Sequence, residues 1–103
     1  MKKKVFVIGL GLIGASLCRA IKGSSITLYG WDHSEETREI AEKTQLVDQV
    51  VTGIEAASQM DVIILAVPVQ VSLEYLNCLA TLPLKETVLV SDTGSTKATI
   101  MAL

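Results

Sequence analysis

Short apolar runs alternate along the chain with segments whose apolar residues recur at helical spacing. The runs that read as strands fill residues 5–8, 26–31, 48–52, 61–67 and 87–91. The first and fourth runs are continuously apolar near their centres, which is typical of strands covered on both faces of a parallel sheet. The intervening segments predict helices over 12–22, 34–44 and 69–80, and a turn or brief helix over 53–59.

This alternation predicts an α/β fold of the Rossmann type. Parallel strands joined by right-handed crossover helices bury such a pattern most economically, with sheet order 3-2-1-4-5 and helices on both faces. In the third long helix, we expect the buried stripe to be Val69, Leu73, Leu76 and Ala80. After Asp92 the chain is expected to turn into a further helix that is cut short at residue 103.

Composition limits the chain to a single domain over residues 1–103. It has nine Lys and Arg against eleven Asp and Glu, a net charge of -2, and 50% hydrophobic residues. One core of this size leaves no room for a cofactor domain together with a substrate domain, so the chain is a binding module or a fragment of a longer enzyme. The absence of a basic stripe argues against a nucleic-acid partner, and the apolar content excludes disorder.

The N-terminus resembles a secretory signal, with three lysines followed by an apolar run over 5–17. Glycines interrupt that run, no small-x-small cleavage site follows, and the run is too short to span a membrane. The two cysteines, Cys18 and Cys78, lie in apolar helical segments without metal-ligand spacing. We therefore expect both to be buried thiols in a reducing cytoplasm, with no disulfide and no metal.

The first strand runs into a glycine-rich loop with the pattern GxGxxG. In this setting Gly9 permits the tight turn, Gly11 lets a diphosphate approach the backbone, and Gly14 lets the helix pack on the strand. Backbone N–H groups at the helix start then face the ligand. The predicted cofactor contacts in this loop are Gly9, Leu10, Gly11, Leu12, Ile13 and Gly14. The alternatives are a glycine-rich turn without a ligand, or a flavin.

Asp32 ends the second strand eighteen residues after Gly14, where the fingerprint places an acid on the adenosine ribose. A carboxylate accepts hydrogen bonds from the ribose diol and repels a 2′-phosphate, so NAD is predicted over NADP. The alternative is a helix-capping role for Asp32, shared with Ser34. The only histidine, His33, is expected on the adenine side of the cofactor, far from the reacting atoms.

Four segments resemble the N-terminal domain of prephenate and arogenate dehydrogenases. They are VIGLGLIGASL at 7–17, YGWD at 29–32, AVP at 66–68 and SDTGSTK at 91–97. The resemblance covers essentially the whole chain. It implies an NAD(P)-linked oxidative decarboxylation of prephenate or arogenate in tyrosine biosynthesis.

The same resemblance implies roles for particular residues. Ser95 matches the family's serine near the substrate, although it would also serve as a helix cap. Ala66, Val67 and Pro68 are expected to pass beside the cofactor. The family's catalytic histidine and carboxylate-binding arginine have no counterpart after His33 and Arg38. The chain is therefore expected to bind cofactor without turnover, and to lack a C-terminal helical domain that completes the cleft and forms a homodimer.

Two other function classes remain open at this level. One is a different dehydrogenase or reductase, such as a pyrroline-carboxylate reductase or hydroxyacid dehydrogenase, whose NADP-dependent members Asp32 disfavours. The other is a regulatory domain that senses NAD without chemistry, for which the turn at 94–97 has no evident purpose. The residues leave open the choice between prephenate and arogenate, and feedback inhibition by tyrosine.

Overall fold

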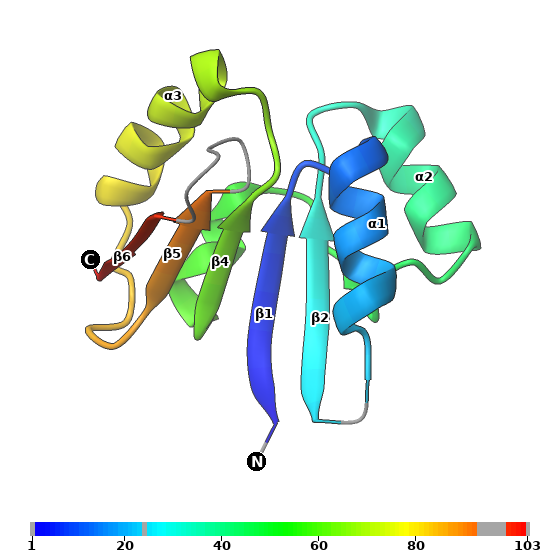
Figure 1. Cartoon of the computed structure of the whole chain (residues 1–103), viewed down its shortest axis with the longest axis horizontal. Helices are drawn as coiled ribbons and strands as arrows, with labels where there is room; N and C mark the ends of the chain where they lie inside the picture. Colours follow the sequence, from blue (N-terminus) through cyan, green and yellow to red (C-terminus); the bar gives the residue numbers. More distant parts are fainter. Residues whose placement is uncertain (1, 24, 93–98, 103) are drawn as a thin grey trace.

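The computed structural model describes residues 2–23, 25–92 and 99–102 and forms one mixed sheet flanked by helices (Figure 1). The strands are ordered β3-β2-β1-β4-β5-β6 across the sheet. In chain order the elements are β1 (Lys3–Ile8), α1 (Leu12–Ile21), β2 (Ile26–Trp31), α2 (Glu35–Lys43), β3 (Gln49–Val50), the 3-10 helix η1 (Ile54–Gln59), β4 (Val62–Leu65), α3 (Val69–Ala80), β5 (Leu89–Asp92) and β6 (Thr99–Ala102).

The first five strands are parallel and confirm the predicted order 3-2-1-4-5. β1 lies at the centre, with Val5 paired to Leu28 of β2 on one side and to Val62 of β4 on the other. Residues 5–8 are all buried because β1 lies at the centre of the sheet. Their continuous apolar run was the clearest strand signal in the sequence.

The prediction of a helix after Asp92 is wrong for residues 99–102, the part of that segment that the structure describes. Thr99–Ala102 forms strand β6, which pairs antiparallel with β5. Two residues of this segment, Thr99 and Ile100, are β-branched and favour extended backbone. Pairing with β6 also satisfies backbone groups along the outer edge of β5.

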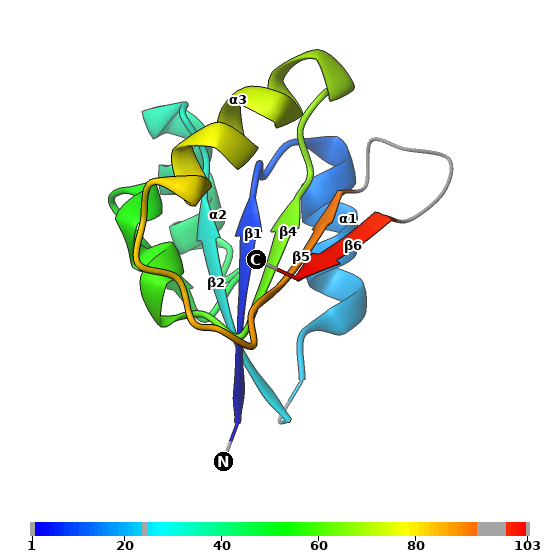
Figure 2. The ribbon, with the colours of Figure 1, turned by 90° about the vertical axis from the view of Figure 1, so that its left-hand side faces the viewer.

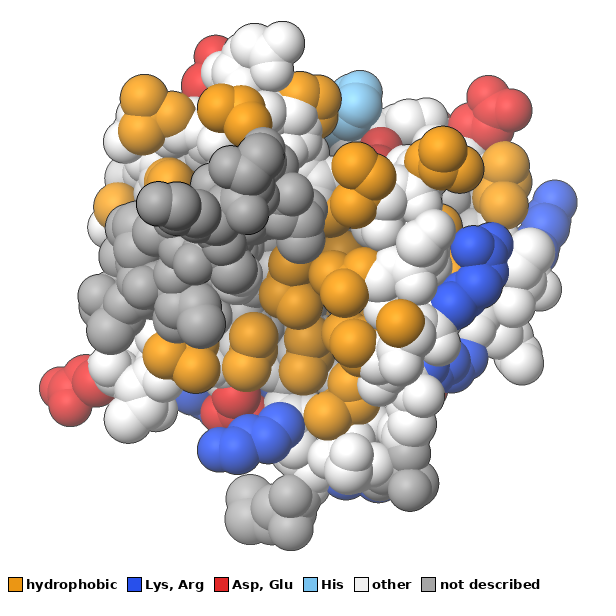
Figure 3. Space-filling view, in the orientation of Figure 1, with side chains coloured by type: hydrophobic (Ala, Val, Ile, Leu, Met, Phe, Trp, Pro, Cys, Tyr) orange, Lys and Arg blue, Asp and Glu red, His pale blue; other side chains and the backbone are white. Residues whose placement is uncertain are grey.

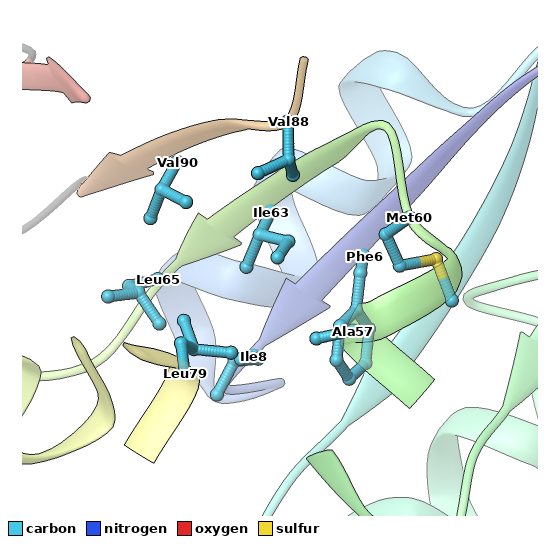
Figure 4. Packing of buried hydrophobic residues seen from close by; sticks show 9 residues of the cluster. All are labelled: Phe6, Ile8, Ala57, Met60, Ile63, Leu65, Leu79, Val88 and Val90. Atoms are coloured by element: carbon cyan, nitrogen blue, oxygen red, sulfur yellow. The ribbon is translucent and has the colours of Figure 1, made fainter. Parts of the chain in front are cut away.

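Helices cover both faces of the sheet, as predicted. Side chains alternate along β1, so that Phe6 and Ile8 face one side while Val5 and Val7 face the other. The first side packs against η1 and α3 in the cluster Phe6, Ile8, Ala57, Met60, Ile63, Leu65, Leu79, Val88 and Val90 (Figure 4). The second side packs against α1 and α2, and Figure 2 shows α1 and α3 on opposite sides of the sheet.

The buried face of α3 differs from the predicted stripe. Val69 and Leu73 are 57% and 64% exposed, whereas Ser72 and Leu79 are buried. The inward face consists of Ser72, Tyr75, Leu76 and Leu79. Apolar residues occur almost all round this helix, so several stripes of period 3.6 fit the sequence equally well. Ser72 is accommodated inside because its hydroxyl donates to the Val69 carbonyl at 2.9 Å.

Apolar side chains also reach the surface on the α1 side of the sheet (Figure 3). Val62 and Ile64 of β4 are only partly buried there, and Leu89 of β5 is 44% exposed. Among the described residues, the cluster on this side is built from β1, β2, α1, α2 and the segment before β3. The β4 and β5 half of this face is therefore the less covered half.

Asp61 ties the amino-terminal ends of three strands together. Its Oδ2 accepts the Lys4 N–H at 2.8 Å, and its Oδ1 lies 3.0 Å from the Lys85 ammonium. Its backbone carbonyl accepts the Leu89 N–H at 3.1 Å. The backbone hydrogen bond from Lys4, followed by the hydrogen bond from Lys85, lowers the pKa of the Asp61 carboxyl.

This lowered pKa predicts a specific acid sensitivity. The Asp61 contribution to the free energy of unfolding is fully present above the unfolded-state pKa of about 3.9 and is lost as pH falls through the lower folded-state value. Asp61→Asn should reduce the urea midpoint at pH 7, and the gap from the parent chain should narrow below about pH 4. A gap that stays constant from pH 7 to pH 2.5 would contradict this account.

Candidate functional site

The carboxyl ends of β1, β2 and β4 meet at one edge of the sheet, where α1 and α3 begin (Figure 1). The segments that follow these strands are the glycine loop, Asp32 with His33, and 66–68. Open α/β sheets bind ligands in the crevice outside this edge. The fold thus brings the three predicted cofactor segments, 9–14, Asp32 and 66–68, to the same edge of the sheet.

Two of the loop glycines are required by packing. Gly9 has φ of +100°, and a Cβ built there would lie 2.5 Å from the Ala66 carbonyl oxygen. A Cβ on Gly14 would collide with the carbonyl oxygen of Gly9. The Gly9 N–H donates to the Trp31 carbonyl at 2.8 Å, which ties the turn to β2. These contacts support the tight-turn and close-packing roles predicted for the two residues.

Gly11 differs, because nothing lies within 4 Å of a Cβ built there. It is the N-cap of α1, without a side-chain hydrogen bond to the helix, and the first turn carries no acidic residue. Leu12 and Ile13 are 89% and 63% exposed. The first N–H groups of a helix have no partner within it and attract anions. This open end of α1 can therefore receive a phosphate group.

A hollow of about 420 Å³ lies beside this helix end. Its lining residues are Gly11, Leu12, Ile13, Ala66, Val67, Pro68 and Val69. The volume lies within the usual range for small-molecule sites. The loop and the 66–68 segment, predicted separately from the sequence, line one cavity.

Asp32 turns its carboxylate toward the glycine loop. Its Oδ2 accepts the Leu10 N–H at 2.8 Å, and its Oδ1 accepts the Ser34 N–H at 2.9 Å. The Asp32 residue is only 8% exposed. A carboxylate has about four acceptor positions, so two remain for further donors such as a ribose diol.

The start of α2 is built around the same residue. Ser34 is the N-cap, with its hydroxyl accepting the Thr37 N–H at 3.3 Å. The Arg38 guanidinium donates to the Asp32 backbone carbonyl at 2.6 Å. His33 has an 81% exposed side chain, and its Nδ1 lies 3.4 Å from Asp32 Oδ1. Asp32 therefore supports the helix start, as the alternative reading expected, while also facing the loop.

A second hollow of about 440 Å³ lies between this turn and α3. It is lined by His33, Val67, Pro68, Val71, Glu74, Tyr75 and Cys78. His33 is one of its lining residues, and its predicted place on the adenine side of the cofactor stays a prediction. The α3 residues were missed at the sequence level, although their spacing of i, i+3, i+4 and i+7 marks one helix face. Val67 and Pro68 line both hollows.

Other predicted site residues are placed less simply. Leu10 is buried in the core, and its N–H is already bonded to Asp32, so it supports the loop from beneath. Ser95 and Lys97 lie outside the described residues. Cys18 is buried as expected, but Cys78 is exposed, which corrects the prediction that both thiols are buried. Cys78 lies on the outward face of α3, three residues from Tyr75 on the wall of the second hollow.

The two thiols should differ sharply in reactivity. Burial raises the pKa of the Cys18 thiol to about 11, against the smaller opposite effect of Arg19 and Lys22. At pH 8 a thiol-specific chromogenic reagent should label Cys78 within minutes and Cys18 only after unfolding in urea. The Cys78→Ser variant should then show no fast thiol. Rapid release of two equivalents of the reagent's chromophore per folded parent chain would contradict the burial of Cys18.

Two further features of the described residues limit the site. Within 2–23, 25–92 and 99–102, no group of three His, Cys, Asp or Glu side chains lies close enough together to hold a metal ion. In the same part of the chain, no helix combines the length and apolar character needed to cross a membrane.

The fold and the loop geometry define a Rossmann-type nucleotide-binding domain. Residues 17–102 match the family described as "Prephenate dehydrogenase, nucleotide-binding domain". The chain belongs to this family. The match starts after the glycine loop, so the loop is supported separately by its geometry and by relatives that align along nearly the whole chain.

Three relatives illustrate the similarity. A prephenate dehydrogenase of Lactococcus lactis is 44% identical over 98% of this chain and 29% of that protein. The crystal structure of Synechocystis arogenate dehydrogenase superposes with a TM-score of 0.78 at 35% identity, covering 91% of this chain and 34% of the other. The crystal structure of prephenate dehydrogenase from Aquifex aeolicus, in complex with hydroxyphenyl propionate and NAD+, superposes with a TM-score of 0.82 at 27% identity. This match covers 94% of this chain and 35% of the other. The chain thus spans about a third of the length of these relatives.

Proposed function

We propose that this chain is the NAD-binding part of a dehydrogenase that oxidatively decarboxylates prephenate or arogenate. The observation that carries the proposal is the Asp32 carboxylate, which faces the glycine loop through its 2.8 Å hydrogen bond from the Leu10 N–H. Beside it, Gly11 opens on a hollow with space for a ligand backbone. Family membership and the solved relatives named above support the same reading.

The residues present fit a dinucleotide. The N–H groups at the start of α1 would hold the diphosphate, and the two remaining acceptor positions of Asp32 would hold the ribose diol. Ala66, Val67 and Pro68, which line the same hollow, would lie along the cofactor. When bound, NAD supplies the acceptor for a hydride from the substrate. The negative charge of Asp32 favours a free 2′-hydroxyl over a 2′-phosphate.

Arg38 does not supply the cation that a 2′-phosphate would need. Its guanidinium is already bonded to the Asp32 carbonyl, at the base of the turn. A switch of this side chain toward the ribose would break that bond. This arrangement supports NAD over NADP.

The substrate half of the reaction is assigned to residues elsewhere in a longer protein. Ser95 is the one residue of this chain that we place on the substrate side, on the strength of the family resemblance. A helical domain after residue 103 would supply the histidine and arginine and the homodimer contacts. We place the protein in the cytoplasm, with a small-molecule substrate and without nucleic-acid or membrane partners.

A different NAD(P)-dependent dehydrogenase, or an NAD sensor without chemistry, is the alternative. A 3-hydroxyisobutyrate dehydrogenase from Mycobacterium tuberculosis shares the fold at 25% identity and a TM-score of 0.66, lower on both measures than the two solved structures above. The family match therefore favours the prephenate and arogenate class.

Calorimetric titration of the purified chain with NAD and NADP tests the cofactor assignment. NAD should bind, and at least about tenfold tighter than NADP, which corresponds to 1.4 kcal/mol. Tighter binding of NADP, or no binding of either, would contradict the proposal. Enzyme-like oxidation of prephenate by the 103 residues alone would show that the reacting groups were wrongly assigned to another domain.

A further inference from the structure

The second hollow presents one face of α3 that cofactor binding by the glycine loop does not explain. Val71, Glu74, Tyr75 and Cys78 follow one another at i, i+3, i+4 and i+7, so they form a continuous wall. This wall faces His33, the residue directly after Asp32. In a dinucleotide whose diphosphate lies at α1 and whose ribose lies at Asp32, the base attached to that ribose would lie beyond Asp32, beside this hollow.

Charge also indicates which end of a dinucleotide this hollow accepts. Glu74 is the carboxylate among its lining residues, and none of them is a lysine or arginine. Asp32 adds a second negative charge close by, close enough to raise the pKa of the Tyr75 phenol, although burial contributes more to that shift. Such surroundings repel phosphate and favour an uncharged ring with hydrogen-bond donors.

The walls of the hollow suit a flat ring. Val67, Pro68 and Val71 provide apolar surface, and the Tyr75 ring is fixed by an edge-on contact with Trp31 at a centroid distance of 6.1 Å. Apolar walls with a few polar groups at the rim are typical of sites for small aromatic ligands. The polar group at the rim therefore decides which edge of the ring is recognised.

Within the described residues, the Glu74 carboxylate has neither a hydrogen bond nor an ion pair, and its side chain is exposed on the wall. An ionised carboxylate only accepts hydrogen bonds. The exocyclic amino group of adenine donates, whereas hypoxanthine carries a carbonyl oxygen at the same position. Two acceptors facing each other repel, so this side chain can distinguish the two bases.

We infer that Glu74 is a specificity-determining residue that accepts a hydrogen bond from the exocyclic amino group of the adenine base in this second hollow. The inference rests on the proposed function, because it takes the ligand to be a dinucleotide. It adds a base-reading role on α3 to the ribose and diphosphate contacts made by α1 and β2.

The test compares NAD with nicotinamide hypoxanthine dinucleotide by calorimetry on three forms of the chain. The parent chain should bind NAD about fivefold to tenfold tighter than the hypoxanthine analogue. In Glu74→Gln this ratio should fall to within about twofold, because a glutamine amide can turn either a donor or an acceptor toward the base. Glu86→Gln, the same change at an exposed turn residue that lines neither hollow, should keep the parent ratio.

A second readout locates the base independently of affinity. Because Cys78 lines the same hollow, saturating NAD should slow labelling of its thiol at least about fivefold. Failure of both dinucleotides to bind the parent chain would refute the proposed function and this inference with it. Tight NAD binding with unprotected Cys78, or with a base preference unchanged in Glu74→Gln, would refute the inference alone.

Discussion

Gly11→Ala should abolish most cofactor binding while leaving the fold intact. Gly14→Ala should instead act mainly by destabilising the fold. The Cβ of the first variant meets no atom within 4 Å but enters the hollow at the start of α1. We expect the Kd for NAD to rise at least about tenfold, with a loss of unfolding free energy below about 1 kcal/mol. The Cβ of the second variant collides with the Gly9 carbonyl oxygen, a backbone atom with no room to move.

The second variant should therefore lose about 3 kcal/mol of unfolding free energy, at the upper end for overpacking. Urea unfolding and calorimetric titration of the two variants make the comparison. The chemical change is identical and the two positions are three residues apart, so each variant is the control for the other. Equal stability losses would contradict the loop geometry, and unchanged NAD affinity in Gly11→Ala would contradict the placement of the diphosphate.

Asp32→Asn should weaken NAD binding about tenfold and reduce the preference for NAD over NADP. Both carboxylate oxygens accept backbone N–H groups, from Leu10 and Ser34, and an asparagine offers only one oxygen. In the variant, one of these two backbone N–H groups is left without its acceptor, which should cost about 1–2 kcal/mol of unfolding free energy. Loss of the negative charge removes the repulsion of a 2′-phosphate.

Asp48→Asn is the matched control for this prediction. Asp48 Oδ2 accepts the Leu28 N–H of β2 at 2.7 Å, so its carboxylate makes the same kind of bond to a backbone amide. It lines neither hollow. The control should lose stability without a change in the ratio of NAD to NADP affinity. Equal changes in cofactor preference in both variants would show that the effect is structural and not local to the ribose.

Much of the fold could be predicted from residues whose surroundings leave little choice. Continuous apolar runs in the sequence predicted the central strands. The glycine spacing predicted the loop, because Gly9 and Gly14 each face a backbone carbonyl that excludes a side chain. Asp32 was recognisable because the distance from the loop to the end of β2 is set by one helix and one turn. These signals are local in sequence and strongly constrained in space.

The remaining errors come from places where the sequence allowed several answers. α3 is apolar nearly all round, so only its docking on the sheet decides that Leu79 is buried while Val69 and Cys78 are not. β6 pairs antiparallel with β5, and strand pairing of this kind depends on the open edge of β5 more than on local propensity. The hollow on α3 was missed because its lining mixes apolar and polar side chains.

Val67 and Pro68 line both hollows, and this has a consequence for inhibitor chemistry. Two weak fragments, one in each cavity, would lie next to each other at these shared residues. Joining them by a short tether past Val67 and Pro68 would make the second contact intramolecular and multiply affinity without any new contact. The exposed thiol of Cys78 offers such compounds a covalent anchor on the far wall.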